Sequence, residues 1–105
     1  MTQPILKDFI IYKIVCLDDS VDLCYVGSTC NWKGRSRQHQ YACNNESCKF
    51  YNLKIYKMIR ENGGWKEFKM IQIATREQIS RRQAEQVEEE YRVELKANMN
   101  QRKCF

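Results

Sequence analysis

A short stretch from Tyr25 to His39 combines a strand, a polar turn and a helix, and it constrains the fold more than any other segment. The strand is predicted to stop at Gly27. Asn31 is well placed to cap the following helix, because its side-chain oxygen can accept a free backbone N–H of the first turn. Arg35 and His39 are four residues apart, so on a helix they share one face. A phenol, a guanidinium and an imidazole are therefore predicted to meet at one strand-to-helix corner.

The rest of the chain predicts a single α+β domain over residues 1–105. Runs of β-branched and aromatic residues predict strands at 9–17, 22–27 and 65–74, and apolar residues at helical spacing predict helices at 32–42, 50–61 and 76–96. Thr75 is the expected N-cap of the last helix, and Gly63 and Gly64 follow the end of the helix before it. We expect a three-stranded antiparallel sheet flanked by helices, in the order β-β-α-α-β-α, with residues 1–8 and 98–105 irregular.

Charge and cysteine content narrow the classes of function. The net charge of +5 permits a polyanionic partner without requiring one. The sequence has no apolar run long enough to span a membrane and no signal-peptide pattern at its start, so we expect an intracellular protein, in cytoplasm or nucleus, without membrane association. The six cysteines lack C-x-x-C spacing and are expected to be free thiols. A zinc site among Cys16, Cys24, Cys30, Cys43 and Cys48, or a structural disulfide, is the alternative.

Four side chains suit proton transfer or phosphate binding. Tyr12 and Tyr25 are expected on neighbouring strands, and a tyrosine acts as a base only where cations or hydrogen bonds favour its phenolate. The guanidinium of Arg35 suits a phosphate oxygen, and His39 is the only histidine in the chain. In the alternative interpretation the tyrosines pack on the sheet, the arginine is solvated and the histidine is structural.

A run of acidic residues occupies positions 85–90 of the predicted last helix. Most of such a run is expected to form a solvated face with pairs four residues apart. Glu88 is different, because it borders the apolar stripe that continues through Tyr91 to Leu95 and can point inward. A carboxylate at the edge of a core is a suitable ligand for Mg²⁺, which takes one or two carboxylates and keeps several waters.

Taken together, these residues form two short motifs followed by single residues at defined spacings. The motifs are Ile10-Ile11-Tyr12 and Tyr25-Val26-Gly27, and the single residues are Arg35, His39, Glu88 with Tyr91, and Asn100. This ordered set, with a middle helix and glycine turn at 53–63, resembles the GIY-YIG endonuclease domain over residues 9–100. One departure is Ile10, which stands where the first motif has glycine; this position supplies strand backbone, so a cost in local fit is expected.

The resemblance implies a metal-dependent endonuclease that hydrolyses phosphodiester bonds in DNA. It implies one Mg²⁺ or Mn²⁺ held by Glu88, with Tyr12 as the candidate general base and Tyr25 orienting phosphate or water. It further implies that Arg35 neutralises developing charge, that His39 accepts the tyrosine proton or fixes its hydroxyl, and that Asn100 steadies the tail near the site. Which tyrosine is the base stays open.

The domain is little larger than the family core, so little sequence specificity of its own is expected. We expect nonspecific or structure-selective cutting, or a protein partner that supplies the specificity, with DNA repair or recombination as the setting. Lys33, Arg37 and Lys49 are the predicted DNA-contacting residues, and their binding should weaken with salt. The main alternative is a non-catalytic nucleic-acid-binding module of the same fold; a thiol-rich zinc or redox protein is the third.

Overall fold

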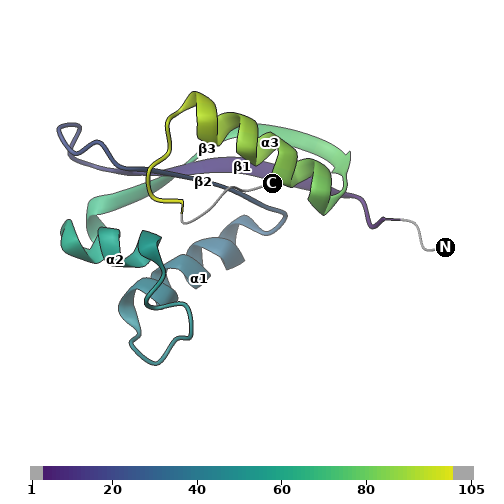
Figure 1. Cartoon of the computed structure of the whole chain (residues 1–105). Coiled ribbons are helices and arrows are strands. Elements are labelled where there is room, and N and C mark those ends of the chain that lie inside the picture. Colours follow the sequence, from purple (N-terminus) through teal and green to yellow (C-terminus); the bar gives the residue numbers. More distant parts are fainter. Residues whose placement is uncertain (1–3, 101–105) are drawn as a thin grey trace.

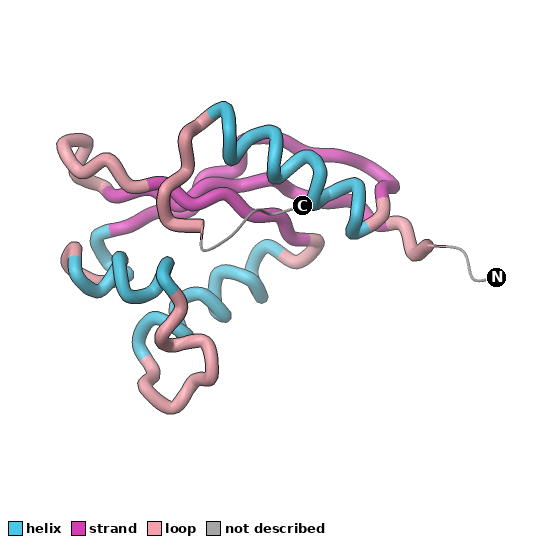
Figure 2. The backbone as a smooth tube through the Cα atoms, viewed as in Figure 1, coloured by secondary structure: helices cyan, strands magenta, loops and turns pink. Residues whose placement is uncertain are grey.

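The computed structural model describes residues 4–100 of the chain. Its elements, in order, are β1 (Lys7–Cys16), β2 (Cys24–Thr29), α1 (Trp32–Asn44), α2 (Lys54–Glu61), the short 3₁₀ helix η1 (Trp65–Glu67), β3 (Phe68–Ile79) and α3 (Arg81–Glu94). The strands form one antiparallel sheet in the order β2-β1-β3. Figures 1 and 2 show α3 over one face of this sheet and α1 and α2 on the other. The predicted α+β class and the three-stranded antiparallel sheet are confirmed.

The prediction placed the end of the last strand and the start of the last helix too early. β3 continues to Ile79, and α3 begins at Arg81 rather than at residue 76. Thr75 is therefore not an N-cap but pairs with Ile10 in the sheet. The cap is Ser80, whose side chain accepts a hydrogen bond from the backbone N–H of Gln83 at 3.1 Å while the Gln83 side chain accepts from the Ser80 N–H at 2.8 Å.

Other boundaries differ by shorter lengths. β3 begins at Phe68, because residues 65–67 form η1, and α2 begins at Lys54, because 48–53 form successive turns. α3 ends at Glu94, so Leu95, predicted on the inner side, is 36% exposed. In the part of the chain that the structure describes, no helix has both the length and the apolarity to cross a bilayer.

The central strand β1 is buried on both faces. Successive strand residues point to opposite faces of a sheet. Tyr12 and Ile14 accordingly belong to the core between the sheet, α1 and α2, whereas Phe9 and Ile11 are buried on the face that α3 covers. Tyr12 has no exposed surface, so the phenol of the first motif lies in the interior and not at the solvent-exposed surface.

The free edge of β2 is covered by the segment that follows α3. The side-chain oxygens of Asn98 and Asn100 accept hydrogen bonds from the N–H groups of Cys24 and Val26, at 2.9 and 3.1 Å. The side-chain nitrogen of Asn100 donates to the carbonyl of Val26 at 2.9 Å. The two amides thus pair with an edge strand as a neighbouring strand would. The predicted irregular tail is described only to residue 100; the remainder, including Cys104, lies outside the described residues.

Candidate active site

The predicted strand-to-helix corner is present, with one correction. β2 does not stop at Gly27 but continues to Thr29. The Asn31 side-chain oxygen accepts a hydrogen bond from the N–H of Gly34 at 3.1 Å, and so caps α1 as predicted. This start fixes α1 so that Arg35 and His39, one turn apart, both reach the hydroxyl of Tyr12 on β1.

Gly27 lies in the middle of β2, where the hydroxyl of Tyr12 packs against it. The two residues are direct cross-strand partners, and a Cβ on Gly27 would stand 2.6 Å from the Tyr12 oxygen. No side chain fits in that space without displacing the phenol. The glycine of the second motif therefore makes room for the tyrosine of the first.

Four side chains from β1, α1 and α2 form a connected set of hydrogen bonds. Arg35 Nε donates to the Tyr12 oxygen at 3.2 Å. The same oxygen lies 2.8 Å from His39 Nε2, and His39 Nδ1 lies 2.8 Å from the hydroxyl of Tyr56 on α2. Two of these groups were predicted to interact with Tyr12; Tyr56 was not.

Burial dominates the protonation of this set. It raises the pKa of Tyr12 far above the ordinary tyrosine value, with a further rise from Tyr25 and an opposing effect of the Arg35 charge. Burial, followed by the same arginine charge, lowers the pKa of His39 to about 3. His39 is therefore neutral at ordinary pH, with one ring nitrogen as donor and the other as acceptor.

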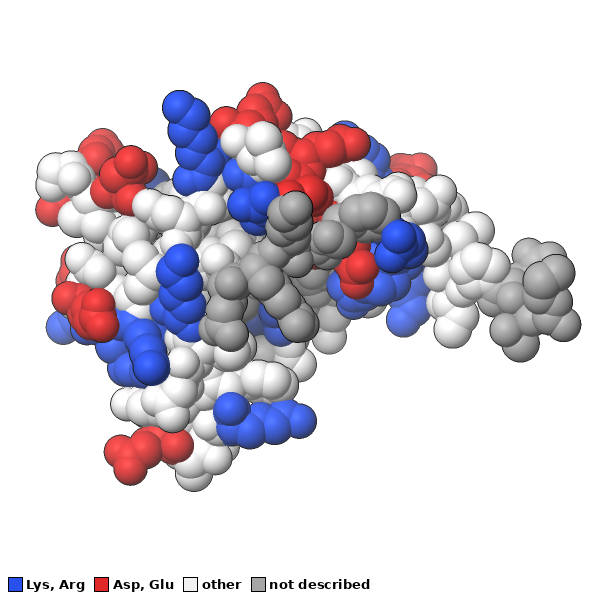
Figure 3. Space-filling view, viewed as in Figure 1, with Lys and Arg blue, Asp and Glu red and all other residues white. Residues whose placement is uncertain are grey.

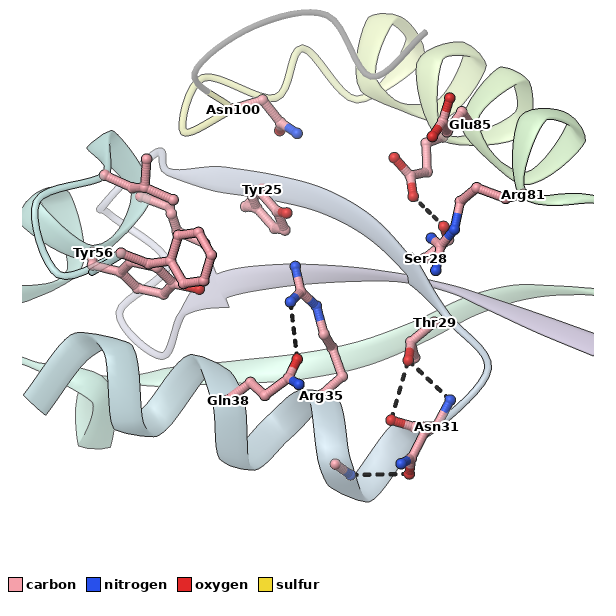
Figure 4. Close-up of a pocket in the computed structure, with 15 residues that line it drawn as sticks. Tyr25, Ser28, Thr29, Asn31, Arg35, Gln38, Tyr56, Arg81, Glu85 and Asn100 are labelled. Atoms are coloured by element: carbon pink, nitrogen blue, oxygen red, sulfur yellow. Dashed lines mark hydrogen bonds between the residues drawn. The ribbon is translucent and has the colours of Figure 1, made fainter. Parts of the chain in front are cut away.

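In front of this set lies an open cleft of about 720 Å³. Its lining combines residues of β2, α1, α2 and α3 with the segment after α3, as Figure 4 shows. The polar lining residues include Tyr25, Ser28, Thr29, Asn31, Arg35, Gln38, Tyr56, Arg81, Glu85, Glu88 and Asn100. Arg35 points into the cleft from α1, where its NH1 donates to Gln38 at 3.1 Å, and the carboxylates approach from α3 on the opposite side.

The carboxylate of Glu88 is bound to the sheet, because the Ser28 hydroxyl of β2 donates a hydrogen bond to its Oε1. Among residues 4–100 no group of three or more His, Cys, Asp or Glu side chains is arranged to hold a metal ion. The five described cysteines are free thiols. The cleft wall near α3 instead offers hard oxygen atoms from Glu88, Glu85 and Ser28. This donor set fits a cation such as Mg²⁺, which needs only one or two carboxylates and completes its shell with water.

The structure divides the predicted site residues into three groups. Tyr25, Arg35, Glu88 and Asn100 line the cleft, and Tyr12 and His39 lie buried behind it. Lys33, Arg37 and Lys49, the predicted DNA contacts, are exposed, on α1 and in the loop after it, and lie outside the cleft lining.

Among the cleft residues that sequence reasoning did not assign to the site are Ser28, Tyr56, Arg81 and Glu85. Ser28 and Tyr56 contact predicted site residues, and Arg81, at the first turn of α3, lines the cleft. Ser28 directly follows the second motif, and Arg81 is the first residue of α3, so a correct prediction of the helix start would have drawn attention to it. Tyr56 gave no such signal, because a tyrosine on a helix with an apolar stripe is typical of a core.

One kind of comparison with known proteins, that with models of protein families, gives a match. The family model described as the GIY-YIG catalytic domain matches residues 8–102, nearly the whole chain. No curated protein and no solved structure matches the chain.

Proposed function

The chain belongs to the GIY-YIG catalytic-domain family, whose members are generally endonucleases, and from that membership we propose that it hydrolyses phosphodiester bonds in DNA with one divalent metal ion. The observation that carries the proposal is that Arg35 from α1 and Glu88 from α3 line the same cleft. The phenol of Tyr12 contacts this arginine from the interior. A site that only binds DNA gains nothing from a carboxylate that faces the phosphate, because like charges repel.

Arg35 has two tasks in this proposal. Its guanidinium lines the cleft, so it can bind a phosphate oxygen and oppose the negative charge that grows during attack. It also donates to Tyr12, and its charge lowers the pKa of that phenol. Tyr12 is our candidate for the general base, because its oxygen contacts both a cation and a neutral imidazole that can accept its proton. Tyr25 would orient the phosphate or the water; its ring centroid lies 6.3 Å from that of Tyr12.

Glu88 would hold Mg²⁺ or Mn²⁺, with the Ser28 hydroxyl fixing the direction of the carboxylate. When bound, such an ion stabilises charge on the scissile phosphate and on the leaving oxygen. Asn100 would keep the segment after α3 in place beside the cleft through its two hydrogen bonds to Val26.

We also propose that the enzyme acts inside the cell, in DNA repair or recombination, has little sequence specificity of its own and depends on a protein partner for target choice. Figure 3 shows a group of acidic side chains over α3, with Lys and Arg side chains beside it, and side chains of both charges spread across the rest of that face. A duplex would therefore favour the α1 side of the cleft, where Lys33, Arg37 and Lys49 are exposed. These three residues remain the proposed phosphate contacts outside the cleft.

A plasmid-nicking assay with Mg²⁺ or Mn²⁺ tests the proposal. Arg35→Ala and Glu88→Gln should each lower the rate at least about 100-fold. The matched controls Arg76→Ala and Glu90→Gln, which change exposed residues of the same types, should cut like the wild type. Equal rates for all five proteins would refute the site. A wild type that binds duplex, flap or single-stranded DNA but cuts none would instead favour the non-catalytic binding module.

A further inference from the structure

Tyr56 connects the buried pair Tyr12 and His39 to the cleft. Its hydroxyl lies 2.8 Å from His39 Nδ1, its side chain is only 4% exposed, and yet it belongs to the cleft lining. Tyr12 contacts the other ring nitrogen, Nε2, also at 2.8 Å. The imidazole is held between these two phenols and stacks on Trp65, with ring centroids 6.0 Å apart and planes at 20°.

Counting donors gives the hydrogen bonds a direction. Arg35 Nε can only donate, so the Tyr12 oxygen accepts from it. Within the described residues, the acceptor available to the Tyr12 hydroxyl is then His39 Nε2. A neutral imidazole that accepts at Nε2 carries its hydrogen on Nδ1 and donates it to the oxygen of Tyr56. The hydroxyl hydrogen of Tyr56 is left to point onward toward the cleft.

We propose that Tyr56 is a positioning residue that holds His39 in the Nδ1–H tautomer and completes a path by which the Tyr12 proton leaves the interior. This inference rests on the proposed nuclease function. Tyr12 must first lose its proton if it is to accept one from the attacking water. Without a partner for Nδ1–H, the imidazole would be free to carry its hydrogen on Nε2, where it could not accept from Tyr12.

The proton transfers balance. The Tyr12 proton moves to Nε2, the Nδ1 proton moves to the Tyr56 oxygen, and the original Tyr56 proton moves to a water in the cleft. His39 changes tautomer and stays neutral throughout, as its low pKa requires. The Tyr12 phenolate, beside Arg35, then takes a proton from the attacking water. The leaving oxygen takes its proton from cleft water. After product release, Tyr12 gives the proton that it took to the water that refills the cleft, and the transfers then run in reverse: a cleft water protonates Tyr56, the Tyr56 proton moves to Nδ1, and the Nε2 proton returns to Tyr12.

The single histidine makes the tautomer directly measurable, independently of any cutting. In chain labelled with ¹⁵N-histidine, the wild type should give NMR shifts of a neutral ring protonated on Nδ1. Tyr56→Phe removes only the hydroxyl and should shift the ring toward the Nε2–H tautomer. Tyr41→Phe, a change at an exposed tyrosine of α1, should leave the spectrum unchanged.

The second test measures the kinetics of DNA nicking. Tyr56→Phe should lower kcat at least about tenfold with KM unchanged, since general acid–base catalysis as a whole contributes 10²–10⁴. A wild-type ring protonated on Nε2, or a Tyr56→Phe variant with unaltered tautomer and unaltered kcat, would overturn the inference. If the wild type cut no DNA, the proposed function and the relay would both fail, but the spectra would still show whether Tyr56 positions His39.

Discussion

The stability of the fold should depend on pH through His39, and the chain allows this dependence to be isolated because it has no other histidine. His39 has no exposed surface and is hydrogen-bonded at both ring nitrogens. Burial first, and the charge of Arg35 second, lower its pKa to about 3. In the unfolded chain a histidine has a pKa of about 6.5.

The sign of the effect follows from proton linkage. Between about pH 6.5 and pH 3 the unfolded chain binds a proton at His39 that the folded protein does not. The free energy of unfolding therefore increases as the pH rises across this window and decreases as the pH falls. From pH 7.5 to pH 5 this one group should cost about 2 kcal/mol, which for a domain of this size is a fall of roughly 8 °C in Tm.

Urea unfolding under reducing conditions, at pH 7.5, 6.5, 5.5 and 5.0, measures this loss. His39→Gln serves as the reference, because it keeps every carboxylate of the wild type and removes only the titrating ring. The wild type should lose about 2 kcal/mol more than the variant over this range, whatever their difference at pH 7.5. Parallel curves would refute the reasoning, since they would mean that the folded protein protonates His39 as easily as the unfolded chain does.

Three further substitutions test the packing around the site. Gly27→Ala should lower the free energy of unfolding by about 1–3 kcal/mol and reduce nicking, because its methyl group meets the Tyr12 hydroxyl; an unchanged thermal melt would contradict this. Asn100→Ala should cost about 1–3 kcal/mol in the same melt, since it leaves the edge of β2 without two hydrogen bonds. Ser28→Ala should keep the fold but raise the Mg²⁺ concentration for half-maximal nicking about 10- to 100-fold, because Glu88 loses the hydroxyl that orients it; an unaltered Mg²⁺ titration would argue against this role.

The N-terminal half could be predicted from sequence because its structure depends on close neighbours. The hairpin joins two strands across a short turn, in which the N–H and hydroxyl of Ser20 bond the Asp18 side chain. The helix cap Asn31 lies three residues from the N–H that it satisfies. Arg35 and His39 share a face through helical spacing alone.

The end of β3 could not be found in this way, because the sequence offers two equivalent helix starts. Thr75 and Gln78 have the same capping-box spacing as Ser80 and Gln83. The choice is made by distant residues: β1 is long enough for Lys7 to pair with Ile79, and Asp8 accepts hydrogen bonds from the backbone and side chain of Gln78, both at 3.0 Å. These contacts join residues about seventy positions apart, which no local pattern encodes. Tyr56 was missed for the same reason, since its partner lies on another helix.

The double role proposed for Arg35 gives a last test, in which charge is kept and geometry is changed. A lysine at this position keeps the positive charge of the cleft but lacks the planar fork that lets one side chain donate to Tyr12 and to a phosphate together. Arg35→Lys should therefore bind duplex DNA within about threefold of the wild type, because binding is dominated by charge. Its kcat should fall at least about 100-fold, because the buried phenol loses the donor that opposes the rise in its pKa. Binding by fluorescence anisotropy and single-turnover nicking, measured on one preparation, separate the two effects. Near-normal cutting by the lysine variant would mean that charge alone is needed, and that the contact between Arg35 and Tyr12 has no part in the reaction.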